Sequence, residues 1–291
     1  MAILVEPAPA KVNLTLRVAG RRGDGLHEIA SLVAFAGPEA ADTLTCDPDV
    51  PFAVEVTGPF AADLAGVNLV ETAIALAREQ EPALATGAFV LSKRLPVAAG
   101  IGGGSADAGA ALRLLRRLNP SAAIDWTAIA RRLGADVPVC FANRAAYMTG
   151  AGEILHPVAS LPPLRTVLVN PRVAVPADKT AQVFRALRAA PLPADPASPA
   201  LVPGPFADAG AVLRYMADHP NDLAPAARAV VPALDAVLAA VAATTGCRMA
   251  RLSGGGPTCF GVYDTAHAAE TAALSIIRSH PSWWVGATAL R

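Results

Sequence analysis

The residue types best suited to chemistry cluster in one glycine-rich stretch, Leu95 to Ser105 (LPVAAGIGGGS), which a helix-like segment over 106–118 follows directly. Glycines so close together leave backbone N–H groups free to converge on an anion. The positive end of the dipole of the following helix adds to that attraction. The stretch therefore predicts a phosphate-binding loop, although a flexible turn before a core helix is an alternative interpretation of the same residues.

The loop matches neither of the two commonest nucleotide-binding signatures. A Walker A loop places a lysine and a hydroxyl after its last glycine, whereas Gly104 is followed by Ser105 and Ala106. A dinucleotide-binding fingerprint would need glycine or alanine where the chain has Ser105 or Asp107. Both of these familiar site types are therefore excluded.

Length and composition favour an enzyme of about two domains that binds neither nucleic acid nor an anionic membrane. Lysine plus arginine and aspartate plus glutamate number 24 each, so no overall field attracts nucleic acid or an anionic membrane. No apolar run approaches the roughly 18 residues of a membrane span. The N-terminal residues lack the basic and apolar regions of a secretory signal, so we expect a soluble, cytoplasmic protein.

Cysteine and lysine usage add two further constraints. The four cysteines stand far apart, and neither they nor the five histidines have metal-ligand spacing, which predicts free thiols and no structural metal. Only three of the 24 basic residues are lysines: Lys11, Lys93 and Lys179. A chain that uses arginine for general charge is expected to keep lysine where a compact, flexible ammonium is needed.

Hydrophobic periodicity predicts an alternation of strands and helices. Strands are expected over 12–18, 29–35, 43–46, 52–57, 88–91, 145–148, 154–155, 165–169, 248–252 and 259–263, those of the N-terminal part mainly antiparallel. Helices are expected over 68–78 with Asn68 as a cap, 106–118, 126–133 with a left-handed Gly134 at its end, 180–188 and 232–244. The proline-rich segment 191–205 predicts a surface loop or linker.

Three segments in this order resemble the three motifs of the GHMP family of small-molecule kinases: Pro9 to Asn13, Pro96 to Ser105, and Leu252 to Thr258. Four further segments narrow the resemblance to members whose substrate is a cytidine diphosphate derivative of methylerythritol: Gly20 to Glu28, Leu133 to Val139, Gly150 to Leu155, and Asn221 to Leu223. The motifs are specific as a set because they occur in this order with these residues. The resemblance spans nearly the whole chain.

The resemblance implies a two-lobed α+β fold with the active site in the cleft. The N-terminal ATP-binding lobe, over 1–160, would be ribosomal-S5-domain-2-like, and the C-terminal lobe, over 161–291, ferredoxin-like. ATP would phosphorylate the 2-hydroxyl of the cytidine diphosphate methylerythritol, with Mg²⁺ as cofactor and Ser105 as its candidate ligand. The implied partner is this small molecule alone, with no nucleic acid or membrane, and the implied oligomeric state is a monomer or weak homodimer.

By the same resemblance, the reacting groups come from the first two motifs and from Asp136. Gly102, Gly103, Gly104 and Ser105 would hold the phosphates, within a motif that also includes Pro96 and Gly100. Asp136 would accept the substrate proton or position the hydroxyl, and Lys11 would stabilise the developing charge. Asn13 would assist near the reacting hydroxyl.

Substrate recognition would come from four other places. His27 would bond the cytosine edge and Phe184 would stack on the ring, while Leu26 stands where the family usually has tyrosine and should weaken stacking. Asn68 and Lys93 would line the adenosine pocket. The third glycine loop, Ser253, Gly254, Gly255 and Gly256, would close on the substrate phosphates.

Two other functions remain open. The first is a GHMP kinase for another alcohol such as homoserine or mevalonate, against which the segment Gly20 to Glu28 argues because only cytidine recognition gives it an evident use. The second is a nucleotide-binding module without catalysis, against which the presence of both Lys11 and Asp136 argues.

Overall fold

The part of the chain that the structure describes folds into two units that together contain three sheets. The computed structural model describes residues 2–176, 178–192 and 202–291, so the predicted linker over 191–205 lies mostly outside the described residues. The chain divides into unit 1, made of Met1–Lys11, Ala40–Val97 and Gly102–Asn143, and unit 2, made of Val12–Glu39, Ala98–Ile101 and Arg144–Arg291. The sequence analysis placed the boundary between the two lobes of the kinase family between residues 160 and 161, and that boundary stays a prediction.

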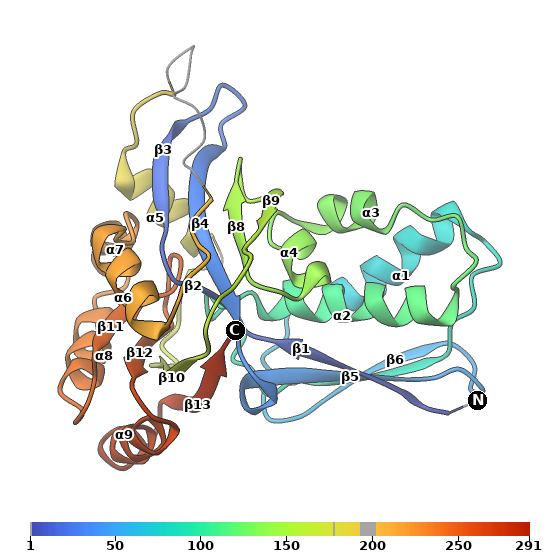
Figure 1. Ribbon diagram of the computed structural model, residues 1–291. Helices are drawn as coiled ribbons and strands as arrows, with labels where there is room; N and C mark the ends of the chain where they lie inside the picture. Colours follow the sequence, from blue (N-terminus) through green and yellow to red (C-terminus); the bar gives the residue numbers. More distant parts are fainter. Residues whose placement is uncertain (1, 177, 193–201) are drawn as a thin grey trace. The chain divides into compact units, whose positions relative to one another are not determined.

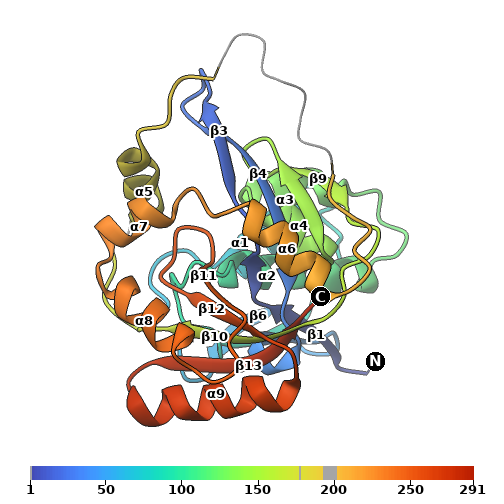
Figure 2. The ribbon, with the colours of Figure 1, turned by 60° about the vertical axis from the view of Figure 1, so that its left-hand side comes forward.

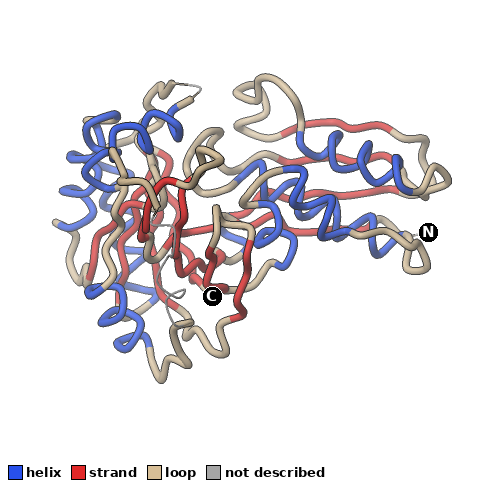
Figure 3. Tube along the Cα trace, turned by 90° about the horizontal axis from the view of Figure 1, so that it is seen from above, coloured by secondary structure: helices blue, strands red, loops and turns tan. Residues whose placement is uncertain are grey.

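Unit 1 consists of a four-stranded sheet with helices on one face (Figure 1). The strand order is β1 (Leu4–Pro9), β5 (Ala41–Asp47), β7 (Ala88–Ser92), β6 (Ala53–Thr57), antiparallel except for the parallel β6–β7 pair. The helices are α1 (Leu69–Gln80), α2 (Gly103–Leu118), α3 (Trp126–Leu133) and α4 (Val137–Ala142). Seen from above in Figure 3, the helices of this unit run along its strands.

The core of unit 1 forms where α2 covers the sheet. α2 packs against β1 and β5 and against the neighbouring helices α1 and α4. Leu44 and Leu91 of the sheet and Leu112 and Leu114 of α2 are fully buried, as the alternation of the strands and the apolar face of the helix require. This packing fixes α2 on the sheet, and the glycine loop leads directly into that helix.

Unit 2 contains two sheets. One has the antiparallel order β11 (Met249–Leu252), β12 (Cys259–Tyr263), β10 (Leu164–Asn170), β13 (Trp284–Leu290), with α8 (Ala233–Ala242) and α9 (Ala266–Ser279) packed on it. The other has the order β2 (Lys11–Asn13), β4 (His27–Phe35), β8 (Ala146–Thr149), β9 (Ile154–Pro157), with β3 (Arg17–Arg21) also paired to β4. Figure 2 shows α9 lying along β13.

The remaining elements of unit 2 are short. They are the 3₁₀ turn η1 (Pro38–Ala40), which ends at the first residue of the next unit 1 segment, and the helices α5 (Lys179–Leu187), α6 (Ala209–Asp218) and α7 (Ala224–Val230). Val183 of α5 and Leu223, just before α7, join one hydrophobic cluster with Val167, Leu234 and Leu252. This cluster holds α5 against the sheet that carries the third glycine loop.

Two local predictions are corrected. The strand expected over 12–18 is divided into β2 and β3, because Leu14 N and Thr15 N both donate to the Leu32 carbonyl, which leaves one residue too many on this strand. Gly134 has φ 153° and ψ 160°, a conformation that favours glycine but lies outside the αL region expected for the end of α3, and α4 begins three residues later at Val137.

The other predicted strands and helices are confirmed to within a few residues at their ends. The sequence analysis missed β1, β13, α4, α6, α7 and α9, where alanine-rich or short segments give weak periodicity. Among the described residues, no helix has the length and apolar character needed to cross a membrane.

Candidate active site

The predicted phosphate loop of unit 1 presents unused backbone donors at the start of α2. Gly102 precedes the helix with φ 66°, a left-handed conformation that glycine adopts without strain. Among the described residues, no hydrogen bond uses the N–H groups of Gly103, Gly104 or Ser105. Three free N–H groups at the positive end of a 16-residue helix are the arrangement that an anion site requires.

Lys93 is buried beneath this loop, not solvated. Its ammonium donates to Asp42 Oδ2 at 2.5 Å and to Asp107 Oδ2 at 2.7 Å, and a Cβ at Gly103 would lie 3.6 Å from Nζ. Asp42 Oδ1 also accepts from Leu95 N at 2.8 Å. Lys93 therefore links the segment entering the glycine loop, through Asp42, to Asp107 of α2, and its predicted contact with adenosine stays a prediction.

The three charges of this cluster do not cancel, because two carboxylates face one ammonium. Burial raises the pKa of Asp107 to about 7, and the negative charge of Asp42 adds to the rise against the opposing effect of Lys93. Asp107 Oδ1 has no hydrogen-bond partner among the described residues. The cluster thus holds a carboxyl that is partly protonated near neutral pH.

Lys11 and Asp136 form an ion pair next to the same loop. Lys11 Nζ lies 3.0 Å from Asp136 Oδ1, and a Cβ at Gly102 would lie 3.4 Å from the Lys11 side chain. Asp136 precedes α4 as its N-cap residue, yet its side chain makes no capping hydrogen bond. The Asp136 side chain is 38% exposed and that of Lys11 only 5%, so the pair presents its carboxylate to solvent.

Asp136 is positioned by the close contact between α4 and α2. A Cβ at Gly109 would lie 2.7 Å from the carbonyl carbon of Cys140, so only glycine permits this approach. Arg113 of α2 donates to Cys140 O at 2.5 Å and to Pro7 O at 2.7 Å. The short helix that follows Asp136 is therefore fixed to both α2 and β1.

In unit 2, His27 and Phe184 stack on each other. Their ring centroids are 4.5 Å apart with an interplanar angle of 25°. Burial, with a smaller contribution from the charge of Arg21, lowers the pKa of His27, so its imidazole is neutral near pH 7. A neutral imidazole has one donor and one acceptor nitrogen, which the edge of a cytosine can use.

The stack forms because the β3–β4 hairpin is tied to the segment after α5. Arg21 N donates to Ala190 O at 2.8 Å, and Leu192 N donates back to Arg21 O at 2.8 Å. At the other side of the hairpin, Gly150 N donates to Glu28 Oε1 at 2.9 Å. Leu26 is exposed in the turn of this hairpin, one residue from His27.

The third glycine loop joins β11 to β12 and meets two other predicted segments. Ser253 Oγ accepts from Asn13 N at 3.2 Å and donates to Gly100 O at 3.4 Å. A Cβ at Gly100 would collide with the Gly256 carbonyl, which explains why residue 100 is glycine. Unit 2 therefore brings Asn13 and Gly100 together with Ser253 to Gly256.

Two predicted residues have plainer surroundings. Asn68 is the N-cap of α1, where its Oδ1 accepts from Val70 N at 2.9 Å. Its predicted contact with the nucleotide stays a prediction. Pro96 lies buried just before the glycine loop.

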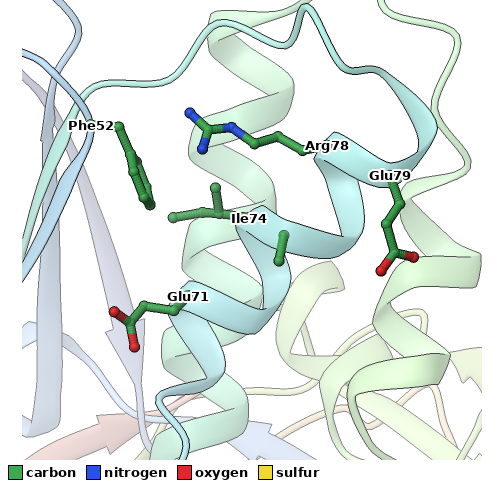
Figure 4. Close-up of a pocket in the computed structure, with 6 residues that line it drawn as sticks. Phe52, Glu71, Ile74, Arg78 and Glu79 are labelled. Atoms are coloured by element: carbon green, nitrogen blue, oxygen red, sulfur yellow. The ribbon is translucent and has the colours of Figure 1, made fainter.

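A pocket of about 490 Å³ on α1 contains none of the predicted residues (Figure 4). Its lining is Phe52, Glu71, Ile74, Ala75, Arg78 and Glu79. The guanidinium carbon of Arg78 lies 4.4 Å from the centroid of the Phe52 ring. This cation–π contact accounts for both side chains, so the pocket adds nothing to the candidate site.

Comparison with known proteins decides the family. The model of the GHMP kinases N terminal domain matches residues 68–144, and that of the GHMP kinases C terminal matches residues 199–281. A 4-diphosphocytidyl-2-C-methyl-D-erythritol kinase of Xanthobacter autotrophicus is 48% identical over 299 residues, covering 100% of both chains. The chain belongs to the 4-diphosphocytidyl-2-C-methyl-D-erythritol kinase family.

Solved structures agree with this assignment of the family. A crystal structure of a 4-(cytidine 5'-diphospho)-2C-methyl-D-erythritol kinase is 34% identical, with a TM-score of 0.75 and coverage of 98% of this chain and 99% of the other. A homoserine kinase from Cytophaga hutchinsonii is 14% identical with a TM-score of 0.64 over 99% and 96% of the two chains, and shares the fold alone. The predicted two-lobed GHMP kinase fold is confirmed.

Four residues that support the site gave little or no signal in the sequence. Asp42 and Arg113 gave no signal, because their partners lie far away in the chain. Asn221 lies in a segment typical of this kinase family, yet its role emerges only from the fold: its Nδ2 donates to Leu252 O at 3.0 Å and to Gly254 O at 2.8 Å. Lys179 was marked only by the scarcity of lysine.

Proposed function

We propose that this kinase transfers the γ-phosphoryl group of ATP to the 2-hydroxyl of 4-(cytidine 5′-diphospho)-2-C-methyl-D-erythritol, giving ADP and the 2-phosphate. One observation carries the proposal above all: the ion pair of Lys11 and Asp136 lies beside a helix start with three unused N–H groups. An anion site, a cation and a solvent-facing carboxylate are what transfer of a phosphoryl group to an alcohol requires.

The division of roles follows from the contacts. The N–H groups of Gly103, Gly104 and Ser105 bind the phosphates of ATP. The Asp136 carboxylate accepts the proton of the substrate hydroxyl while the hydroxyl oxygen bonds to the γ-phosphorus and the bond from that phosphorus to the ADP oxygen breaks. Lys11 holds Asp136 in place and stabilises the negative charge on the transferring group.

Cytidine recognition is assigned to unit 2. The neutral His27 bonds the cytosine edge, and Phe184 offers a ring face for stacking. Since the two rings are in contact at 4.5 Å, the base stacks on an outer face or enters by parting them. Asn13 and the loop Ser253 to Gly256 hold the part of the substrate next to the reacting hydroxyl.

Magnesium would arrive with the nucleotide. Among the described residues, no group of three or more His, Cys, Asp or Glu side chains is placed to hold a metal. Mg²⁺ in such enzymes keeps several waters and uses substrate phosphates with one or two protein oxygens. The Ser105 hydroxyl at the start of α2 is a suitable oxygen, so these residues fit a metal that neutralises phosphate charge.

The decisive experiment measures ADP release by the purified chain with ATP and magnesium. Four reactions are compared: the cytidine diphosphate methylerythritol, homoserine, mevalonate and no acceptor. We expect release with the cytidine substrate alone. Release with another alcohol would overturn the substrate assignment, and silence with all acceptors despite ATP binding would favour a module without catalysis.

A further inference from the structure

Lys179 is a buried lysine that the proposed reaction does not use. It is the first residue of α5, and its ammonium donates to the carbonyls of Gly255, at 3.2 Å, and Gly256. Both carbonyls belong to the third glycine loop, between β11 and β12. A cation that reaches two successive loop carbonyls restricts the backbone of a segment that has almost no side chains of its own.

Carbonyls fixed on one side of this loop direct N–H groups to the other side. In a trans peptide the C=O of one residue and the N–H of the next point in opposite directions. Asn221 holds the Gly254 carbonyl and so sets the Gly255 N–H, while Lys179 holds the Gly255 carbonyl and so sets the Gly256 N–H, which donates to Ser253 O at 2.9 Å.

Two donors of the loop remain available after this arrangement. Among the described residues, the N–H groups of Gly254 and Gly255 have no hydrogen-bond partner. Successive free N–H groups in a tight turn make a concave anion site. The cytidine substrate carries a diphosphate, which is the chemistry that such a site accepts.

Lys179 also joins this loop to the helix that carries the stacking ring. Val183, one turn after Lys179, packs beneath the loop, since a Cβ at Gly255 would lie 3.7 Å from its side chain. Phe184 is the next residue of the same helix and stacks on His27. The loop and the base-stacking ring are therefore held in register through one helix.

Keeping an ammonium at this position is unfavourable for the fold. Among the described residues, no carboxylate lies within ion-pair distance of Lys179, and the adjacent Asp178 pairs with Gln182 and Arg185 instead. Burial lowers the pKa of Lys179 to about 8. Methionine would fill a similar volume without the desolvation cost of a buried ammonium. The function of the ammonium is therefore to bind the carbonyls of Gly255 and Gly256.

We propose that Lys179 is a positioning residue for the substrate diphosphate: it fixes the third glycine loop against α5, so that the loop N–H groups and Phe184 bind one cytidine diphosphate together. The inference rests on the proposed function. It also predicts that substrate affinity, and not ATP affinity, depends on this lysine.

The test compares Lys179→Met with Leu187→Ala, which loosens the packing of the same helix without touching the loop. We expect Lys179→Met to raise the KM for the cytidine substrate roughly tenfold, the effect of losing charge-assisted hydrogen bonds, and to leave the KM for ATP within about twofold. Leu187→Ala should lower the melting temperature and leave the ratio of the two KM values unchanged. An unchanged substrate KM in folded Lys179→Met overturns the proposal.

A second measurement applies even where Lys179→Met does not fold. In the unmodified chain, the KM for the cytidine substrate should rise a few-fold from pH 7.5 to 9.5 while the KM for ATP stays constant; a flat profile overturns the proposal. Calorimetric binding of cytidine diphosphate, which needs no turnover, separates this inference from the kinase assignment. Tenfold weaker binding by Lys179→Met supports the positioning role even if no ADP is released, and equal binding contradicts it.

Discussion

Two glycine loops of this kinase rest on buried lysines, and the lysines are held in opposite ways. Lys93, 1% exposed, lies beneath the loop of unit 1 between two carboxylates, and Lys179, 5% exposed, lies beneath the loop of unit 2 among carbonyls alone. Burial acts to lower the pKa of both. The charges of Asp107 and Asp42 reverse this for Lys93, whose pKa is raised, whereas the pKa of Lys179 falls to about 8.

Lys11 differs from both of these lysines, because it pairs with Asp136, a carboxylate that is partly exposed. Two buried carboxylates hold Lys93, a solvent-facing carboxylate pairs with Lys11, and among the described residues no carboxylate pairs with Lys179. The difference shows that burial alone does not determine the role of a lysine. Its hydrogen-bond and ion-pair partners determine whether burial lowers its pKa or whether carboxylates keep the ammonium charged. Each case predicts a different response to substitution.

The largest effect is expected for Lys93→Met. Removing the ammonium leaves two buried carboxylates without their shared cation, which should lower the free energy of unfolding by about 3–5 kcal/mol. Urea denaturation measures this. The double variant Lys93→Met, Asp107→Asn should lose less than the single variant, because one of the unpaired charges is also removed. Equal or greater loss in the double variant would break the comparison.

Asp136→Asn should reduce turnover strongly and stability little. The substitution removes the proton acceptor, for which we expect a loss of roughly 10²-fold or more in kcat with ATP binding unchanged. Since the Asp136 side chain is 38% exposed, losing its ion pair should cost at most about 1 kcal/mol in unfolding. Steady-state kinetics and thermal melts report the two quantities, and near-normal turnover would remove Asp136 from the reaction.

Lys179 should leave a signature in the dependence of stability on pH. Its pKa is about 8 in the folded state and near 10.5 when unfolded, so between these values the unfolded chain binds more protons. The contribution of this group to the free energy of unfolding therefore rises with pH across that window, by roughly 2 kcal/mol between pH 7.5 and 10. Urea denaturation at pH 7.5 and 10 gives the free energy of unfolding of the unmodified chain and of Lys179→Met. If the difference in this free energy between the two proteins is the same at both pH values, the lowered pKa is contradicted.

The smallest effect is expected at the cytidine site. Leu26→Tyr would place a ring beside His27, and an added aromatic contact contributes about 1 kcal/mol, or roughly fivefold in affinity. Calorimetry with cytidine diphosphate measures the change, and Leu26→Met serves as an aliphatic control. Unchanged or weaker binding would mean that this chain does not pack the base against residue 26.

The helix that follows the glycine loop could be predicted from the residues themselves, and the structure has that helix. The grouping of Lys11 with Asp136 and of His27 with Phe184 was accessible only through the family resemblance, and both pairs are in contact. What could not be predicted depends on pairings across the chain. Asp42 meets Lys93 only because β5 pairs with β7, and Lys179 meets a loop about 76 residues later because α5 packs on that sheet.

The division of the chain also has a consequence for its synthesis. The backbone passes between the units five times, so neither unit is one continuous segment. When Asn143 has been made, all of unit 1 exists, yet β4 has emerged without β8, with which it pairs over Ser31 to Val33. Until that strand follows, the nascent chain carries an unpaired strand edge, the kind of surface that favours aggregation and recruits chaperones.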